Sequence, residues 1–287
     1  MNPKAVLVTG CSSGIGRAVA LRLAARGDLA VYATARRRET LAELERPAAP
    51  GGQACRTLSL DVNDEASMAA AVAEIERAHG AVWALVNNAG YSQPGAIENV
   101  PLARVRAVFE TNVFGLARLT QLVLPGMRRV GDGRIVNLSS MGGRFTFPGG
   151  GYYHATKHAI EAISDALRFE VSGFGVKVVV VQPGLIRSGF AEAAVGGMGP
   201  PPEGPYAAFE AAVARSTKEA YEKGPLAKLG GEPDDVAKVI ERALTAARPK
   251  PRYTVTGSAT LLLGLRRLLS DRMWDAFLRP TFPTPGR

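Results

Sequence analysis

Tyr153 and Lys157 have the residue types and the spacing for proton transfer. They are four residues apart in a segment of helical character, so both side chains project from one face of a helix. A tyrosine with its ordinary pKa of about 10 is a poor acid or base at neutral pH, and a nearby lysine ammonium lowers that pKa. Ser139 and Ser140 end the preceding apolar segment, where a hydroxyl can stabilise an oxygen that gains charge. The same patterns also occur as an exposed helix pair and as plain turn serines.

A glycine-rich turn at Gly10, Gly14 and Gly16 is the second chemical feature. It follows an apolar, β-branched run at residues 5–8 and precedes residues 17–26, which have helical spacing. A strand that enters a helix through such a turn aims backbone N–H groups and the positive end of the helix dipole at one point. A pyrophosphate is the natural ligand there, although a glycine turn can also be purely structural.

The segment Thr9-Gly10-Cys11-Ser12-Ser13-Gly14-Ile15-Gly16 resembles the cofactor motif of the short-chain dehydrogenases/reductases. Further segments match in the family's order: residues 61–62, 87–90, 111–113, 153–157 and 183–188. Together they extend from Ala5 to Ser188 and leave the C-terminal part least explained. The glycine turn, with residues 33–36, is most similar to the steroid- and retinol-active branch.

The resemblance implies a catalytic group of Asn112, Ser140, Tyr153 and Lys157. In the family a catalytic serine lies thirteen residues before the tyrosine, which selects Ser140 over Ser139. Asn112 matches the asparagine that bends its helix and holds a water linked to the lysine. The implied coenzyme contacts are Gly10, Ser12, Ser13, Gly14, Ile15, Gly16, Asp61, Val62, Asn88, Ala89, Gly90, Tyr153, Lys157, Pro183, Gly184, Ile186 and Ser188.

Arg36 indicates which coenzyme binds. NAD-binding relatives usually carry an acid at the end of the second strand, where this chain has Ala-Thr-Ala-Arg-Arg-Arg and no acid before Glu39. An arginine there attracts the 2′-phosphate of NADP. We therefore expect NADP(H), with Arg36 as a ligand and with Arg37 or Arg38 on a solvated face.

Strand-like and helical segments alternate, which predicts a single α/β domain of Rossmann type with a doubly wound parallel sheet of about seven strands. The expected strands are residues 5–8, 29–34, 54–60, 82–86, 134–138, 176–181 and 252–256. The expected helices are residues 17–26, 39–45, 64–79, 102–129, 153–171, 206–221, 233–247 and 258–279. Pro125 should kink or end the long helix at 102–129.

Composition excludes several other classes. The net charge is +9, but the last forty residues hold eight Lys or Arg against two Asp, and no nucleic-acid-binding motif accompanies them, so we expect no nucleic-acid partner. Cys11 and Cys55 offer no metal cluster or disulfide framework, so we expect no metal and a cytoplasmic protein with reduced thiols. No apolar run approaches the eighteen or so residues that cross a bilayer.

These features predict an NADP(H)-dependent oxidoreductase that interconverts a carbonyl and an alcohol by hydride transfer. A small apolar ketone or aldehyde such as a steroid, a retinoid or a long-chain ketone is the favoured substrate because bulky residues occur in the expected pocket regions: Phe145, Phe147, Phe190, Met198, Tyr206, Phe209 and Tyr221. The alternatives are a catalytically idle NADP-sensing protein on the same fold, which normally lacks the tyrosine or lysine, and a serine hydrolase, for which no G-x-S-x-G motif is present.

The C-terminal part is expected to complete the site. Residues 1–257 should form the coenzyme-binding domain with a substrate lobe at 185–230, and residues 258–287 an amphipathic helical extension packed on it. A lid over the lobe is favoured over a subunit contact or a surface helix on anionic lipid, with simple core packing as the plain alternative. Family members are often homodimers or homotetramers through the helices that include Asn112 and Tyr153, and we expect the same here.

Overall fold

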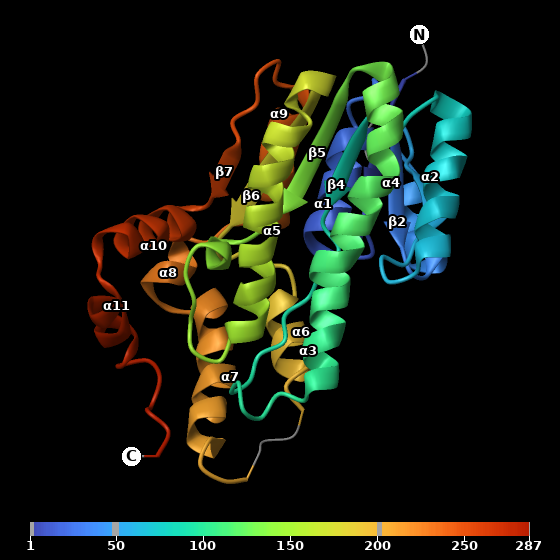
Figure 1. The fold of residues 1–287 in the computed structure, drawn as a ribbon. Helices are drawn as coiled ribbons and strands as arrows, with labels where there is room; N and C mark the ends of the chain where they lie inside the picture. The colour runs from blue at the N-terminus through green and yellow to red at the C-terminus, as the bar shows by residue number, and fades with distance from the viewer. Residues whose placement is uncertain (1–2, 48–51, 200–202, 287) are drawn as a thin grey trace.

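The computed structural model describes residues 3–47, 52–199 and 203–286. Seven parallel strands form one sheet in the order β3-β2-β1-β4-β5-β6-β7 (Figure 1). The strands are β1 (Lys4–Val8), β2 (Leu29–Ala35), β3 (Arg56–Ser59), β4 (Ala84–Asn87), β5 (Gly133–Leu138), β6 (Val176–Pro183) and β7 (Arg252–Val255). The predicted doubly wound parallel sheet is confirmed.

Helices cover both faces of this sheet, which is why its strands are apolar on both sides. Up to β7 the main helices are α1 (Gly14–Ala24), α2 (Glu65–His79), α3 (Leu102–Phe109), α4 (Gly115–Val130), α5 (Gly151–Glu170), α7 (Ala207–Glu222) and α9 (Pro233–Thr245). α1 and α9 enclose one core with Leu23 and Ile240, whereas α2 and α4 enclose the other with Ile75 and Leu119. The remaining elements are α6 (Phe190–Gly196), α8 (Gly224–Lys228), the C-terminal helices α10 (Gly257–Leu268) and α11 (Asp271–Leu278), and the turns η1 (Arg38–Glu45), η2 (Glu110–Phe114), η3 (Met141–Gly143) and η4 (Ser172–Phe174).

The long helix expected at residues 102–129 is divided at a different place from the one predicted. Helix α4 continues through Pro125 to Val130, because Val123 and Met127 are buried on either side of the proline and hold the helix on the sheet. The interruption is the π-helical turn η2 between α3 and α4. A π-turn inserts one extra residue into a helix and is frequent at functional sites.

The C-terminal extension is two helices rather than the single one predicted. Leu269 has extended backbone geometry (φ −87°, ψ 134°), and the Ser270 hydroxyl then caps α11 by accepting a hydrogen bond from the Met273 N–H. The predicted helix at residues 39–45 is also different in kind, since η1 is a 3₁₀ helix.

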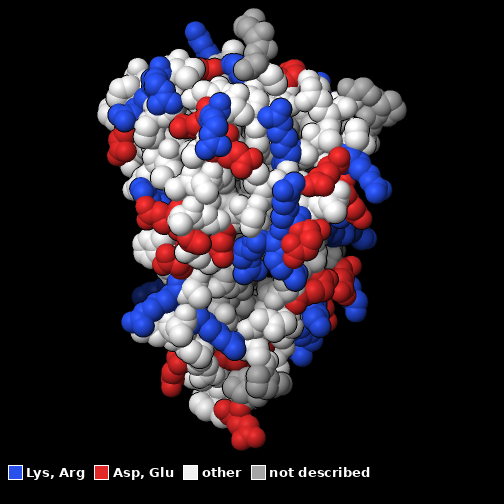
Figure 2. All heavy atoms as spheres, turned by 90° about the vertical axis from the view of Figure 1, so that its right-hand side faces the viewer, with Lys and Arg blue, Asp and Glu red and all other residues white. Residues whose placement is uncertain are grey.

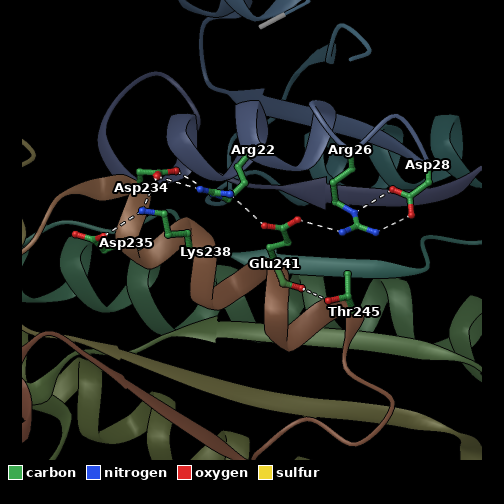
Figure 3. Close-up of polar contacts among 8 residues, drawn as sticks. All are labelled: Arg22, Arg26, Asp28, Asp234, Asp235, Lys238, Glu241 and Thr245. Carbon is green, nitrogen blue, oxygen red and sulfur yellow. Dashed lines mark hydrogen bonds and ion pairs between the residues drawn. The ribbon is translucent and has the colours of Figure 1, made fainter. Parts of the chain in front are cut away.

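Ion pairs fix helix α1 against α9 (Figure 3). The Arg22 guanidinium donates to Asp234 at 2.9 Å, and that of Arg26 donates to Glu241 at 3.1 Å. These side chains are partly exposed, so each pair contributes at most about 1 kcal/mol to stability. Their main consequence is to fix the position of α1 on the sheet. Because α1 carries the glycine turn at its N-terminus, the ion pairs also help to position that turn.

Charges of both signs are mixed over the face of the molecule drawn in Figure 2, which lacks a single basic patch. No helix in the described part of the chain combines the length and apolar character needed to cross a membrane. Within residues 3–47, 52–199 and 203–286, no group of three or more His, Cys, Asp or Glu side chains is arranged to hold a metal ion.

Candidate active site

The expected site residues gather at one edge of the sheet, because the carboxyl ends of parallel strands point the same way. The glycine turn follows β1, residues 88–90 follow β4, and Ser140 follows β5. Strands β1 and β4 are neighbours although β2 and β3 lie between them in sequence, so the chain reverses its winding direction here. Ligands of doubly wound folds bind at such a switch point.

The glycine turn is packed too closely for side chains. Gly10 and Gly14 have φ of +71° and +54°, which favours glycine. A Cβ at Gly16 would collide with the Gly10 carbonyl and would lie 2.5 Å from the Asn88 amide nitrogen. That amide donates to the carbonyl oxygens of Thr9 at 2.9 Å and Gly10 at 3.1 Å, so the side chain of Asn88 braces the turn.

The N-terminus of α1 is suited to an anion. Ser13 occupies the N-cap position, its side chain makes no capping hydrogen bond, and the first turn contains no acidic residue. Ser12 and Ser13 are exposed, whereas Ile15 packs against the core and anchors the turn. Backbone N–H groups in this arrangement fit a pyrophosphate.

Tyr153, Ser140 and Lys157 converge beside this turn. Tyr153 and Lys157 lie on α5, and the Lys157 ammonium is 5.7 Å from the centre of the Tyr153 ring. The same ammonium donates a hydrogen bond of 2.8 Å to the Leu138 carbonyl at the end of β5. Ser140 accepts a hydrogen bond from the Gly142 N–H at 3.1 Å, which fixes the serine above the strand end.

Burial controls the protonation of this group. It raises the pKa of Tyr153 to about 12, and a hydrogen bond with Ser140 opposes that rise. It lowers the pKa of Lys157 to about 8, against the attraction of the Glu161 carboxylate. The sequence predicted a lowered tyrosine pKa; here it is raised because the phenol is buried. The tyrosine therefore carries its proton at neutral pH, which a proton donor requires.

Asn112 lies in the π-turn η2 and links two parts of the site. Its amide nitrogen donates to the Tyr91 carbonyl at 2.9 Å and to the Thr156 hydroxyl at 3.1 Å, and its oxygen accepts from the Tyr91 N–H at 3.0 Å. A Cβ at Gly90 would lie 2.9 Å from that oxygen and 3.9 Å from the Lys157 nitrogen. The π-turn thus aims a buried amide between the segment after β4 and helix α5.

The segment after β6 contacts the glycine turn. Pro183 ends the strand, and the Gly184 N–H donates to the Val255 carbonyl at 3.0 Å. Ile186 is buried, and the Ser188 hydroxyl donates to its carbonyl at 3.3 Å. A Cβ at Gly14 would lie 3.4 Å from that of Ser188. Residues 183–188 therefore border the expected coenzyme site.

Two expected contacts after β3 are engaged in local structure. The Asp61 carboxylate accepts from the Asn63 N–H at 2.9 Å. Val62 is buried against Gly115 at the start of α4. Their backbone groups remain at the same sheet edge as the glycine turn.

Arg36 stands free at the end of β2. Its charge acts on the phenol of Tyr91, which follows β4, and so opposes the rise in the tyrosine's pKa caused by burial. Arg38 instead pairs with Glu45 at 3.3 Å and donates to the Thr57 hydroxyl at 3.0 Å. In the described part of the chain, Arg36 and Arg37 form no ion pair. The side chain of Arg36 is thus available to an anionic group.

A cavity of about 590 Å³ lies between the segment after β6 and helices α6 to α8. Tyr221 lines it, and burial together with the charges of Tyr153 and Glu192 raises the pKa of this tyrosine. The Phe190 ring is 5.7 Å from the Tyr153 ring, centre to centre. Phe190 therefore packs near Tyr153, and Tyr221 connects the surroundings of Tyr153 to the cavity.

The remaining bulky residues expected at the pocket are divided between two apolar clusters. Phe145 and Phe147 pack against Trp274 of α11. Met198, Tyr206 and Phe209 belong to a separate cluster with Ala96 and Val213. Of the seven, only Phe190 and Tyr221 have described contacts with Tyr153 or the cavity.

Some residues that shape the site were not predicted from the sequence. The buried Thr9 hydroxyl accepts from the N–H groups of Asn88 and Ala89, both at 3.0 Å. Glu161 is buried and accepts from Gln182 at 2.9 Å and Arg252 at 2.8 Å. The available signals were Thr9 at the end of an apolar strand and Glu161 one helical turn after Lys157.

Comparisons with known proteins agree with this geometry. Residues 4–198 match the family described as short chain dehydrogenase. The NADPH-dependent 3-dehydrocapnine reductase of Ornithobacterium rhinotracheale is 34% identical, over 94% of each chain. The 17-beta-hydroxysteroid dehydrogenase type 1 of Mus musculus is 35% identical, over 93% of this chain and 77% of that protein.

The fold is shared with solved structures as well. A short-chain dehydrogenase from Streptomyces avermitilis superposes with a TM-score of 0.76 and 36% identity, covering 97% of this chain and 98% of that one. Similar structures include complexes with NADP and with NAD, so the fold alone does not select the coenzyme. The chain belongs to the short-chain dehydrogenase/reductase family, whose members use nicotinamide coenzymes to interconvert carbonyl and alcohol groups.

Proposed function

We propose that the protein is an NADP(H)-dependent enzyme that interconverts an apolar ketone or aldehyde and its alcohol, with Tyr153 as the proton donor in reduction. The observation that carries the proposal is the convergence of a protonated Tyr153, its hydrogen-bonding partner Ser140 and the buried Lys157. Tyr221, whose pKa the charge of Tyr153 raises, lines a cavity nearby.

The chain's residues fit the coenzyme. The uncapped N-terminus of α1 and the closely packed glycine turn would hold the pyrophosphate, and Arg36 would bind the 2′-phosphate. Residues 88–90 and 183–188 would flank the nucleoside and the nicotinamide. When bound, the coenzyme supplies the hydride chemistry.

Each catalytic residue has a separate task. Ser140 would hold the substrate oxygen and stabilise the charge that develops on it. Tyr153 would give that oxygen its proton, and the Lys157 ammonium would favour the resulting phenolate. Asn112 would keep Gly90 and α5 in register around the lysine and support a proton relay.

An apolar substrate fits Phe190 and Tyr221, and the mouse relative's name specifies a steroid. We further propose that residues 1–257 bind the coenzyme, that residues 185–230 form the substrate lobe, and that residues 258–287 cover it. The contacts of Trp274 and Leu278 with the apolar cluster beside Tyr221 support the covering role.

Turnover of NADPH with a panel of steroid, long-chain and small polar ketones and aldehydes tests this function. Tyr153→Phe should lower kcat 100-fold or more, in the range of lost acid catalysis, while NADPH binding is nearly kept. Tyr152→Phe is the matched control, since the neighbouring hydroxyl only contacts the Ile97 carbonyl at 3.3 Å. A Tyr153→Phe enzyme that kept more than about a tenth of the wild-type rate would refute the role of Tyr153. NADPH binding without turnover of any carbonyl would favour an idle coenzyme sensor.

A further inference from the structure

Helices α10 and α11 are held in place by their inner faces alone. Leu262, Trp274 and Leu278 are buried, and the Trp274 indole lies 5.3 Å from the Phe145 ring and donates to the Thr146 carbonyl at 3.2 Å. Figure 1 shows both helices at the margin of the molecule, with α10 directly after β7 and near α8, and α11 farther out. Side chains on their outer faces add little to the packing of the fold, except for Phe277, whose ring centre lies 5.3 Å from that of Trp274.

Those outer faces carry large apolar side chains. Leu261 and Leu268 are 52% and 82% exposed, and Met273 and Phe277 are 55% and 44% exposed. The two leucines are seven residues apart on α10, and Met273 and Phe277 are four apart on α11, so each pair lies on one side of its helix. We call these four residues the outer apolar surface.

Exposed arginines accompany the outer apolar surface. Arg267 and Arg272 are exposed on the same two helices and Arg279 is exposed directly after α11, whereas Arg266 is paired with Asp271 at 2.5 Å. Asp275 is the remaining acid on α10 and α11. A second copy of the chain docked through the same helices would offer these arginines few acids, because Asp271 is already paired with Arg266 and Asp275 is the other acid, so charge complementarity would be poor. Anionic headgroups over an apolar layer complement both the charge and the side chains.

We propose that α10 and α11 dock the protein on the surface of an anionic lipid bilayer. The four apolar side chains would enter the headgroup region while the three arginines contact anionic lipids. The inner side of the same helices packs in the cluster that includes Leu185 and Tyr221, and Tyr221 lines the cavity. Docking would thus bring the substrate lobe close to the apolar phase, independently of which carbonyl compound is reduced.

Sedimentation of the full-length protein with lipid vesicles tests this proposal. Binding should be strong to vesicles with about 30 mol% phosphatidylglycerol, weak to pure phosphatidylcholine vesicles, and reduced at high salt. Replacement of Arg267, Arg272 and Arg279 by Gln should lower the partition coefficient on the order of 100-fold, because each basic residue near such a surface contributes about fivefold. The double variant Leu268→Glu, Met273→Glu should also abolish binding.

Phe169→Glu is the matched control, because Phe169 is 86% exposed but lies on α5. It should bind vesicles like the wild type, as should Tyr153→Phe, which separates docking from catalysis. Thermal unfolding and NADPH binding report whether each variant is folded. Equal partition onto neutral and anionic vesicles would overturn the proposal, as would an equal loss in the Phe169→Glu variant. So would a dimer in analytical ultracentrifugation that only the Leu268 and Met273 substitutions dissociate.

Discussion

Substitution of Gly16 by alanine measures how strictly the glycine turn depends on close backbone packing. The added methyl would lie 2.5 Å from the Asn88 amide nitrogen and 2.8 Å from the Gly10 carbonyl carbon, and nearer still to the Gly10 oxygen. Overpacking of this kind costs about 1–3 kcal/mol. The higher helix propensity of alanine returns about 1 kcal/mol, so we expect a net loss of up to about 2 kcal/mol.

Urea unfolding and NADPH fluorescence titration would follow the two consequences. Movement of Gly10 and Asn88 should misplace the N–H groups of the turn and weaken NADPH binding by at least about tenfold, the value of one hydrogen bond to a charged group. Gly264→Ala in α10 is the control, because no heavy atom lies within 4 Å of its added methyl, and it should stabilise the protein by up to about 1 kcal/mol. A Gly16→Ala protein with wild-type stability and NADPH affinity would refute the packing argument.

Three further outcomes follow from the charges at the site. Arg36→Ala should weaken NADPH binding by roughly 10- to 150-fold and leave NADH binding unchanged, whereas Arg46→Ala should change neither affinity. Burial lowers the pKa of His154 to about 4 from an ordinary value of 6.5, so its neutral form stabilises the fold above pH 6.5 and this contribution is lost as the pH falls toward 4. Glu161→Gln should lower the pKa of Lys157 below about 8 and so move the alkaline limb of the rate profile to lower pH.

For each of these three predictions, a control variant or a refuting result can be stated. Equal affinities of the wild type for NADPH and NADH would contradict the role of Arg36. His154→Gln should reduce the acid sensitivity in urea unfolding much more than His158→Gln, because His158 is exposed and is the smallest of the causes that shift the pKa of His154. Asp165→Asn removes the other carboxylate that pairs with Arg252. If Asp165→Asn moved the alkaline limb of the rate profile as far as Glu161→Gln does, the effect of Glu161 would come from its ion pair with Arg252 and not from a direct effect on the pKa of Lys157.

The sheet was predictable because its strands are short apolar runs separated by helical segments, and all seven were found near their predicted residues. The π-turn at Asn112 could not be predicted from the local sequence, because the residues around it suit an ordinary α-helix. Only the family resemblance suggested a bend there. The break at Leu269 was hidden because apolar residues keep helical spacing across it, and only the Ser270 cap marks it.

The site could be predicted as a set of residues but not as a protonation state. Ser140 directly follows an apolar strand, and Tyr153 and Lys157 lie in the next helical segment, so the sequence order predicted all three at one edge of the sheet. The direction of the tyrosine pKa shift depends on burial, and Phe190 of α6, whose ring centre lies 5.7 Å from that of Tyr153, has no fixed sequence spacing from it. The catalytic and coenzyme roles of these residues stay predictions until the variants are measured.

The ion pairs between α1 and α9 also set a constraint on biosynthesis. Arg22 and Asp234 are 212 residues apart, and Arg26 and Glu241 are 215 apart. At a synthesis rate of about 5–20 residues per second, α1 waits roughly 10 to 40 s for its partner helix. During that interval the apolar side chains of Val19 and Leu23 lack the cover of α9. A nascent chain arrested before residue 233 should therefore bind holdase chaperones or aggregate, even though its glycine turn has already been made.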